Sequence, residues 1–385
     1  MNTEKIVLSL PEDWEGLHTP YIQNALDSCA EAGGEVVLSD GQWHIGSLRM
    51  YSNTTLRLSS GTELIASDRI EDYEDFHVPS TLGYLKSPWM IEAWHLPKHY
   101  IMAPIVAFDA ENVAVIGEPG AVIDGSDCYD PEGEEKFRGP MGMVFSNCCG
   151  VTLKGYTYRN SANWAHQIDS CTGVHMDGVT VLAGHDGINI HHCVGVVIEN
   201  CDFRTGDDCI AGYNAQNVIV RNCSLNTSCQ SFRIGGKNLL VENCRFWGPG
   251  EYPHRVSGRH NTLFAFAYYA IRYDDIAVDS ENWVIRNCTM ENLDSLFDYR
   301  YGADFTHDAR PLREITFENV TITGLNKPAI FNPVAGNPLT VTLRNVTMGK
   351  RENAEMDRMF YTSPDVKMIL ENSTIAGLNG GKRMK

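Results

Sequence analysis

Three aspartates with regular spacing are the residues of this sequence best suited to chemistry. Asp186 and Asp208 are 22 residues apart, and Asp207 precedes Asp208 in the turn-forming run GDDC. Adjacent carboxylates repel one another, and burial raises the pKa of the carboxyl group that keeps the proton. One carboxyl group could protonate the leaving oxygen of a glycosidic bond while another acts on water or on the anomeric carbon. A single aspartate would more often bind calcium or complete a turn, but three in register favour catalysis.

An internal repeat explains why residues 22 positions apart should meet. Its clearest copies are GVVIENCDF (195–203), NVIVRNCSL (217–225), NLLVENCRF (238–246) and NWVIRNCTM (282–290). Weaker copies occupy 150–158, 173–181, 314–322, 340–348 and 367–375. Positions 155, 178, 200, 222 and 243 carry the repeated Gly or Asn, with steps of 23, 22, 22 and 21 residues. This period predicts an all-β fold, a single-stranded right-handed parallel β-helix whose coils stack about 4.8 Å apart.

The step from Asn243 to Asn287 is 44 residues, which we interpret as two turns, the missing one around 261–269. Each repeated Asn should occupy a bend, where its amide bonds to the next Asn along the stack. The cysteine that follows each Asn lacks the paired close spacing of a metal site. We therefore expect reduced, buried, structural cysteines, and neither a metal nor a cofactor.

The organisation expected is one domain over residues 1–385. TPYIQNALDSCAEAGG (19–34) predicts a helix that caps the open end of the β-helix. The cap and first coils occupy 1–67, the main coils 104–375, and a frayed tail 376–385.

Composition limits the partners of the chain. The formal net charge of −18 argues against nucleic acid, because phosphate binding needs a concentrated basic surface. We find no apolar run that predicts a signal peptide or a membrane span. We expect a cytoplasmic protein, or a secreted one if an export segment has been removed, with an oligosaccharide as partner. The oligomeric state is left open.

Several segments resemble the polygalacturonase family, glycoside hydrolase family 28, as a divergent bacterial-type member. The resemblance is carried by PIVAFDAENVAVIGEPGAVIDG (104–125), VTLKGYTYRNSANWAHQIDSCTGV (151–174) and HDGINIHHCVGVVIENCDFRTGDDCIAG (185–212). It implies an inverting hydrolase with Asp207 as general acid. Asp186 and Asp208 would then position and deprotonate the attacking water.

Two departures from the family pattern bear on the substrate. The Gly-His-Gly of the family falls on Cys229-Gln230-Ser231, and Gln230 can form hydrogen bonds but cannot titrate. The Arg-Ile-Lys that binds a uronate carboxylate has its nearest counterpart in Arg272-Tyr273-Asp274. Two unit charges 4 Å apart interact by about 4 kcal/mol near a protein surface, so an Asp there would repel galacturonate. Plain galacturonan is therefore disfavoured as substrate.

Further substrate contacts are expected around the aspartates. Arg233 offers a cation by another route, and His185 and His166 flank the aspartates. Trp164 is either a sugar platform or packing. The sugar-contacting tyrosine of the family corresponds to Tyr299 or Tyr301, in a cluster with Phe305.

The segment 68–103 and the insertion GPGEYPHRVSGRH (248–260) could close one end of a cleft. We therefore expect exo-action on short, imported, pectin-like oligosaccharides. A polysaccharide lyase acting on a uronate-containing glycan and a non-catalytic carbohydrate-binding β-helix are the alternatives. The sugar and its linkage are left open.

Overall fold

The computed structural model describes residues 4–97, 100–273, 276–302 and 310–376. Two compact units divide the chain, unit 1 over residues 1–202 and unit 2 over residues 203–385. Parallel strand ladders build both units, and the predicted right-handed parallel β-helix is confirmed. The single domain over 1–385 stays a prediction. Of the tail predicted to be frayed, residues 377–385 lie outside the described residues.

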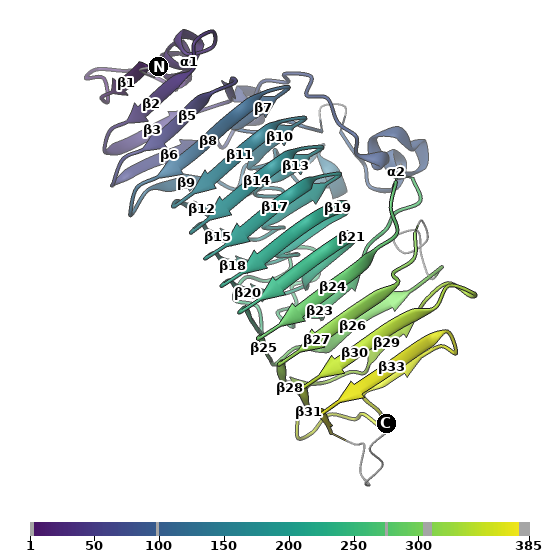
Figure 1. Cartoon of the computed structure of the whole chain (residues 1–385). Helices are drawn as coiled ribbons and strands as arrows, with labels where there is room; N and C mark the ends of the chain where they lie inside the picture. The colour runs from purple at the N-terminus through teal and green to yellow at the C-terminus, as the bar shows by residue number, and fades with distance from the viewer. Residues whose placement is uncertain (1–3, 98–99, 274–275, 303–309, 377–385) are drawn as a thin grey trace. The chain divides into compact units, whose positions relative to one another are not determined.

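Unit 1 stacks its coils through three ladders of parallel strands (Figure 1). The first ladder comprises β1 (Glu4–Leu8), β2 (Gly34–Leu38), β5 (Thr54–Leu58), β8 (Glu111–Gly117), β11 (Cys149–Lys154), β14 (Thr172–Asp177) and β17 (Val194–Glu199). The second comprises β4 (Leu48–Met50), β7 (Ile105–Phe108), β10 (Met143–Ser146), β13 (Gln167–Asp169) and β16 (Ile188–His191). The third comprises β3 (Gly41–Ile45), β6 (Thr62–Ala66), β9 (Val122–Asp124), β12 (Thr157–Arg159) and β15 (Thr180–Ala183). Val174 pairs with Val151 and Val196, so the coils repeat after 23 and 22 residues.

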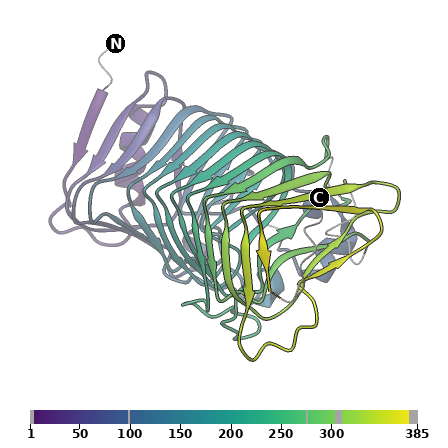
Figure 2. The ribbon, with the colours of Figure 1, turned by 60° about the horizontal axis from the view of Figure 1, so that its bottom comes forward.

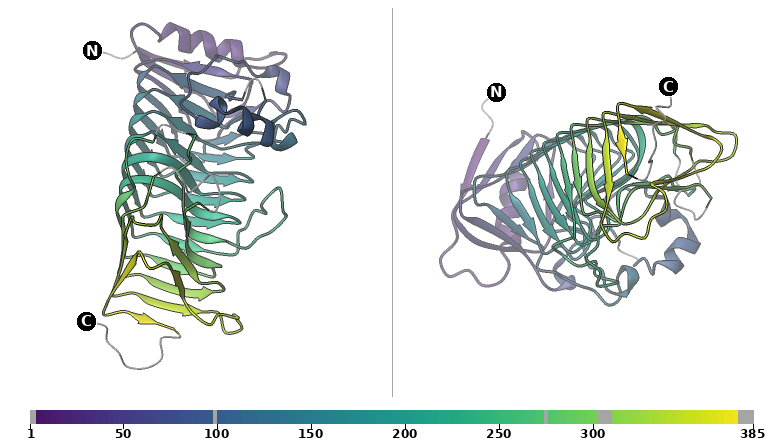
Figure 3. Two further views of the ribbon diagram at one scale, coloured as in Figure 1. Left: turned by 90° about the vertical axis from the view of Figure 1, so that its right-hand side faces the viewer. Right: turned by 90° about the horizontal axis from the view of Figure 1, so that it is seen from below.

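The helix α1 (Thr19–Ser28) lies at the N-terminal end of unit 1, as the sequence predicts (Figure 3). Its apolar face buries Ile22, Ala25 and Leu26 against the first coils. Four short helices interrupt the coils that follow: η1 (Ile70–Asp72), η2 (Gly83–Lys86), α2 (Pro88–Ala93) and η3 (Glu134–Lys136). None of the helices in the described part of the chain is long and apolar enough to span a membrane.

Unit 2 begins within β18 (Asp202–Thr205) and also has three ladders, and its later strands run parallel in Figure 2. The first comprises β19 (Ile210–Arg221), β21 (Gln230–Glu242), β24 (Glu281–Arg286), β27 (Glu314–Glu318), β30 (Leu339–Arg344) and β33 (Val366–Glu371). The second continues from β21 through β23 (Phe264–Tyr268), β26 (Ser295–Arg300), β29 (Ala329–Asn332) and β32 (Phe360–Thr362). The third comprises β20 (Ser224–Thr227), β22 (Arg245–Trp247), β25 (Thr289–Glu291), β28 (Thr321–Leu325), β31 (Thr347–Lys350) and β34 (Thr374–Ile375).

One coil of unit 2 is enlarged, which corrects the interpretation of the 44-residue step as two turns. Leu239 of β21 pairs directly with Trp283 of β24, so the 44 residues between them form a single coil. The stretch around 261–269 supplies β23, which pairs with the first half of β21. The additional residues lie largely in the segment between β22 and β23, here named the 248–263 loop.

Stacked side chains fill the interior and line the bends. Aromatic rings stack between successive coils of unit 2, with centroids 4.9 Å apart for Phe232–Phe266 and again for Phe297–Phe331. The repeated asparagines adopt positive φ, which places them at bends, as their spacing predicts. Asn345 donates to Asn319 and Asn319 to Asn287, at 3.0 and 3.1 Å. A second amide column, Asn217, Asn238 and Asn282, was not predicted.

All twelve cysteines are free, and eleven of them are buried. Cys201, Cys223, Cys244 and Cys288 each donate through Sγ to the backbone carbonyl two residues before them. These bonds fit the structural role expected for the cysteines. Cys149 is the exposed exception.

Asn319 tests the amide column, because its backbone has φ of 54° and its side chain both donates and accepts. We expect Asn319→Ala to lower the free energy of unfolding by about 1–2 kcal/mol, the usual cost of a left-handed backbone at a residue with Cβ. Asn319→Gly should cost less, because glycine tolerates that backbone. Urea denaturation measures both, and equal losses for the two variants would contradict the backbone explanation.

Candidate active site

Asp207 and Asp208 lie in a turn between β18 and β19, and two threonines fix that turn. Thr205 donates through Oγ1 to the carbonyl of Asp207 at 2.6 Å, and Thr227 of the next coil donates to the same oxygen. The two aspartates have different surroundings. The side chain of Asp207 is 17% exposed, whereas that of Asp208 is 2% exposed.

Asp208 is held from the next coil. Its Oδ1 accepts a hydrogen bond from the backbone N–H of Gln230 at 3.1 Å, and Nη1 of Arg233 lies 4.0 Å from its Oδ2. Burial and the charge of Asp207 raise the pKa of Asp208 to about 7, and Arg233 opposes the rise. Since adjacent carboxylates titrate together, this pair keeps a proton to higher pH than an isolated aspartate would.

The two predicted binding residues of this coil lie beside the aspartates. Gln230, the first residue of β21, is half-buried and serves Asp208 through its backbone. Arg233 stacks over the ring of Tyr269, with 4.1 Å between its Cζ and the ring centroid. The cation expected at Arg233 is therefore present, but it faces Asp208.

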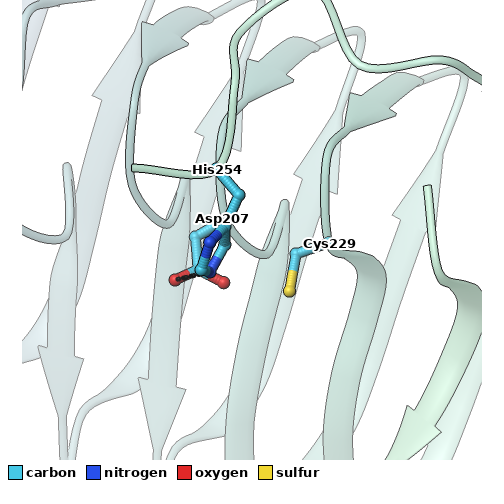
Figure 4. Close-up of side chains that lie close together, drawn as sticks. All are labelled: Asp207, Cys229 and His254. Atoms are coloured by element: carbon cyan, nitrogen blue, oxygen red, sulfur yellow. Dashed lines mark ion pairs between the residues drawn. The ribbon is translucent and has the colours of Figure 1, made fainter. Parts of the chain in front are cut away.

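His254 was missed by sequence reasoning. It projects from the 248–263 loop and places Nε2 3.6 Å from Oδ2 of Asp207; Figure 4 shows the ring directed at that carboxylate. Its side chain is 14% exposed. The available signal was a histidine-bearing insertion close to the expected active-site coil. Two regular turns would have left no long loop in the 44-residue step, so a return of this insertion to Asp207 was not predicted.

Arg259, also in the 248–263 loop, contacts the coil that carries Cys229. Its Nη2 lies 3.0 Å from Sγ of Cys229, and its Nε donates to the carbonyl of Ser228 at 3.1 Å. Burial, reinforced by Asp207 and Asp208, raises the pKa of the Cys229 thiol well above its ordinary value. Cys229 therefore acts as a neutral thiol here, not as a nucleophile.

Asp207, Cys229 and His254 bring potential metal-ligand atoms within 4.8 Å of one another (Figure 4). A metal ion would have to displace the proton of the Cys229 thiol, which the Arg259 guanidinium contacts. It would also have to bind Nε2 of His254, the nitrogen that faces Asp207. Both requirements disfavour a metal ion in this group. A second group, His175, Asp177 and Glu199, lies on the ladder surface of unit 1. There His175 pairs with Glu199, and Lys154 with Asp177, so the group forms surface ion pairs.

In unit 1, Asp186 follows β15 and precedes β16. Its Oδ2 accepts a hydrogen bond from Nδ2 of Asn189 at 2.9 Å, and its carbonyl accepts from Ala165 N–H. The residue is 4% exposed. Its convergence with the two aspartates of unit 2 stays a prediction of the 22-residue register.

Three predicted substrate contacts of unit 1 lie in packed surroundings. His166 is fully buried between the Tyr156 hydroxyl and the Gly187 carbonyl, and burial lowers its pKa to about 4. A neutral ring with both nitrogens engaged in the core does not reach a sugar, so the prediction for His166 is corrected to a structural role. His185 is 1% exposed and packs against Tyr129 and Phe137.

Trp164 is buried as well, between Tyr100 and His191. The burial of Trp164 therefore favours a packing role over that of a platform for a sugar ring.

The remaining candidates belong to the later coils of unit 2. Tyr299 is fully buried and its hydroxyl accepts from the N–H of Leu312, so of the two tyrosines only Tyr301 is partly exposed. Arg272 is exposed in a turn after β23. Asp274 and Phe305 lie outside the described residues.

The raised pKa of Asp208 makes a stability prediction. A folded-state pKa of about 7, above the ordinary 3.8, means that the folded protein binds the proton more tightly. The resulting stability is present below pH 4 and is lost as pH rises to 7 and above. Asp208→Asn cannot ionise, so the variant should gain at least about 1 kcal/mol relative to wild type between pH 4 and pH 8. Denaturant unfolding at both pH values measures this, and a pH-independent difference would contradict it.

Comparisons with known proteins agree with the fold, and one family model spans the three aspartates. The model of glycosyl hydrolases family 28 matches residues 98–231, which include Asp186, Asp207 and Asp208. No curated protein sequence matches the chain.

Solved structures with the same fold are distant in sequence. The family 28 exopolygalacturonase of Yersinia enterocolitica has a TM-score of 0.72 at 17% identity, over 98% of this chain and 76% of that one. A hyperthermoactive exopolygalacturonase of Thermotoga maritima has a TM-score of 0.71 at 16% identity, over 93% and 87%. PfbA, a surface adhesin of Streptococcus pneumoniae, has a TM-score of 0.62 at 15% identity, over 94% and 88%.

The adhesin shows that the fold alone does not determine the activity, so the assignment depends on the family match and on the residues inside it. Residues 98–231 are similar to glycosyl hydrolases family 28, and this similarity points to a polygalacturonase-like glycosidase.

Proposed function

We propose that the protein is an inverting, exo-acting hydrolase of pectin-like oligosaccharides, with Asp207 as general acid. The observation that carries the proposal is the unequal pair of neighbouring carboxyl groups within the family match, Asp208 buried and Asp207 partly open. Environments that separate two adjacent carboxyl groups are typical of acid and base assignments in glycosidases.

The proton retained by the pair supports acid catalysis. The raised pKa of Asp208 lets the pair hold a proton to higher pH than an isolated aspartate would, and burial favours the neutral form of whichever carboxyl is covered. A sugar placed against the more open Asp207 would desolvate it and favour transfer of the shared proton to it. Asp207 would then give that proton to the leaving oxygen as the glycosidic C–O bond breaks.

Asp186 completes the proposed machinery on the basis of the 22-residue register. With Asp208, it would position a water and take its proton as the water oxygen bonds to the anomeric carbon. Attack on the face opposite the leaving group inverts that carbon. The hydrogen bond from Asn189 to Asp186 would keep this carboxylate in a fixed orientation.

The substrate is proposed as pectin-like because of the family match and because two similar structures bear the name exopolygalacturonase. Arg233 is already opposed by Asp208, so Arg272, exposed in its turn, is the better candidate for a uronate carboxylate. Tyr301 is the better candidate for stacking on a sugar.

Support for exo-action comes from the 248–263 loop. It brings His254 against Asp207, so the loop would close one side of the catalytic pair. Twelve free cysteines fit action on imported oligosaccharides in a reducing compartment.

Asp207→Asn tests the general acid. We expect it to reduce kcat on pectin-derived oligosaccharides by about 10²–10⁴-fold, the usual contribution of a positioned acid. Asp357→Asn is the matched control, because Asp357 is exposed and pairs with its neighbour Arg358. Full activity of the Asp207 variant would contradict the assignment. A product absorbing in the ultraviolet would instead favour the lyase alternative.

Product analysis over time tests exo-action. Defined oligosaccharides should lose one terminal unit at a time, and blocking the attacked end should abolish release. Chromatography of early time points distinguishes this outcome from random internal cuts, which would contradict the exo proposal.

A further inference from the structure

We propose that His254 is a positioning residue that holds Oδ2 of Asp207 and thereby places the transferable proton on Oδ1. The inference rests on the proposed function of Asp207 as general acid. Gln230, which replaces the family histidine, contacts Asp208 through its backbone N–H. The role of a histidine beside the aspartates is therefore assigned to the 248–263 loop.

The first support is the direction and distance of the ring. Nε2 of His254 lies 3.6 Å from Oδ2 of Asp207 (Figure 4). This separation is slightly longer than a hydrogen bond. Catalytic hydrogen bonds are often long without substrate and shorten in the substrate complex.

The second support is the tautomer of the ring. The backbone N–H of Ser257 donates to Nδ1 of His254 at 3.3 Å, and a backbone N–H can only donate. Nδ1 is therefore the accepting nitrogen of a neutral imidazole, and Nε2 carries the hydrogen. The hydrogen of the ring consequently points at Oδ2 of Asp207. The same tautomer disfavours a metal ion at Nε2.

The third support is the rigidity of the loop around His254. The N–H of His254 donates to the carbonyl of Arg259 at 2.9 Å, and the N–H of Gly258 donates to the carbonyl of His254 at 2.7 Å. Gly258 has φ of 66°, a conformation that glycine tolerates without strain. This closed turn fixes the backbone from which the ring projects.

The coil below anchors the loop as a whole. Asn226 donates through Nδ2 to the carbonyls of Trp247 and Pro249 at 2.9 and 2.8 Å, and its Oδ1 accepts from Glu251 N–H at 2.7 Å. Arg259 adds its bond to the carbonyl of Ser228. Supporting contacts of this kind keep a site residue in its working geometry.

The chemical consequence follows from donor and acceptor roles. An Nε2–H group can only donate, so the carboxyl oxygen that it meets must be the one without a proton. The acid proton then resides on Oδ1. When that proton leaves, the new negative charge of Asp207 is met at Oδ2 by a hydrogen-bond donor. His254 therefore stabilises the state formed during proton transfer more than the ground state, and its loss should lower kcat with little effect on KM.

The charges around Asp207 determine how a pH profile would respond. The charge nearest to Asp207 on its own turn is Asp208, which Arg233 approaches in turn. The 248–263 loop contributes His254 at Asp207 and Arg259 near Cys229. Removing the donor at His254 would make Asp207 keep its proton to higher pH. The alkaline side of the kcat profile should therefore move upward, whereas a merely structural defect would lower kcat at every pH alike.

The test compares His254→Leu, His254→Gln and, as a control in the same loop, the exposed Val256→Ala. On the oligosaccharide that wild type hydrolyses, His254→Leu should lower kcat by about 10–100-fold, as expected for a lost hydrogen bond to a charged group. KM should change little and the alkaline limb should rise. His254→Gln, whose amide can donate, should recover part of kcat, and Val256→Ala should behave as wild type.

Wild-type kcat in His254→Leu, or a loss without a shift of the alkaline limb and without recovery in His254→Gln, would overturn the role of His254. Circular dichroism and unfolding of each variant identify a loss of folding. Failure of the proposed function gives a different result: activity of wild type is then absent, or Asp207→Asn retains it.

Discussion

Backbone hydrogen bonding between successive coils is the constraint on which the rest of the structure depends. Each strand pairs in parallel with strands one coil away, so a residue is positioned by its place in the repeat. Asp208 receives the N–H of Gln230, 22 residues on, because the coils are in register there. Asparagines with positive φ let each coil turn without interrupting the ladders. Within unit 2 the register thus brings chemistry-bearing residues of successive coils together.

Departure from the regular period matters as much as the period itself. The 44-residue coil between Leu239 and Trp283 keeps its ladder pairing and places its extra residues outside the strands. From there His254 and Arg259 return toward Asp207 and Cys229. A solenoid tolerates such an insertion because the stacked strands carry the fold, and the loop is free to change the site.

The sequence predicted what depends on periodicity and missed what depends on loop geometry. The strand repeats, α1, the left-handed asparagines and the place of Arg233 near Asp208 follow from spacing and residue type. Burial was harder to predict: His166 and Tyr299 are polar aromatic residues close to the aspartates, yet both are packed in the core. His254 could not be placed, because a loop that leaves the ladders has no register from which to compute its neighbours. The replacement of the family histidine by Gln230 therefore suggested a missing group, whereas the 248–263 loop supplies a histidine by another path.

The central claim is that Asp207 protonates the leaving oxygen while a water attacks the opposite face of the sugar. The most direct measurement is proton nuclear magnetic resonance of the first product, recorded before mutarotation mixes the anomers. The account predicts a product anomer opposite to the configuration of the cleaved bond. Retention of that configuration would contradict it, because retention requires a covalent intermediate with a carboxylate in place of direct attack by water.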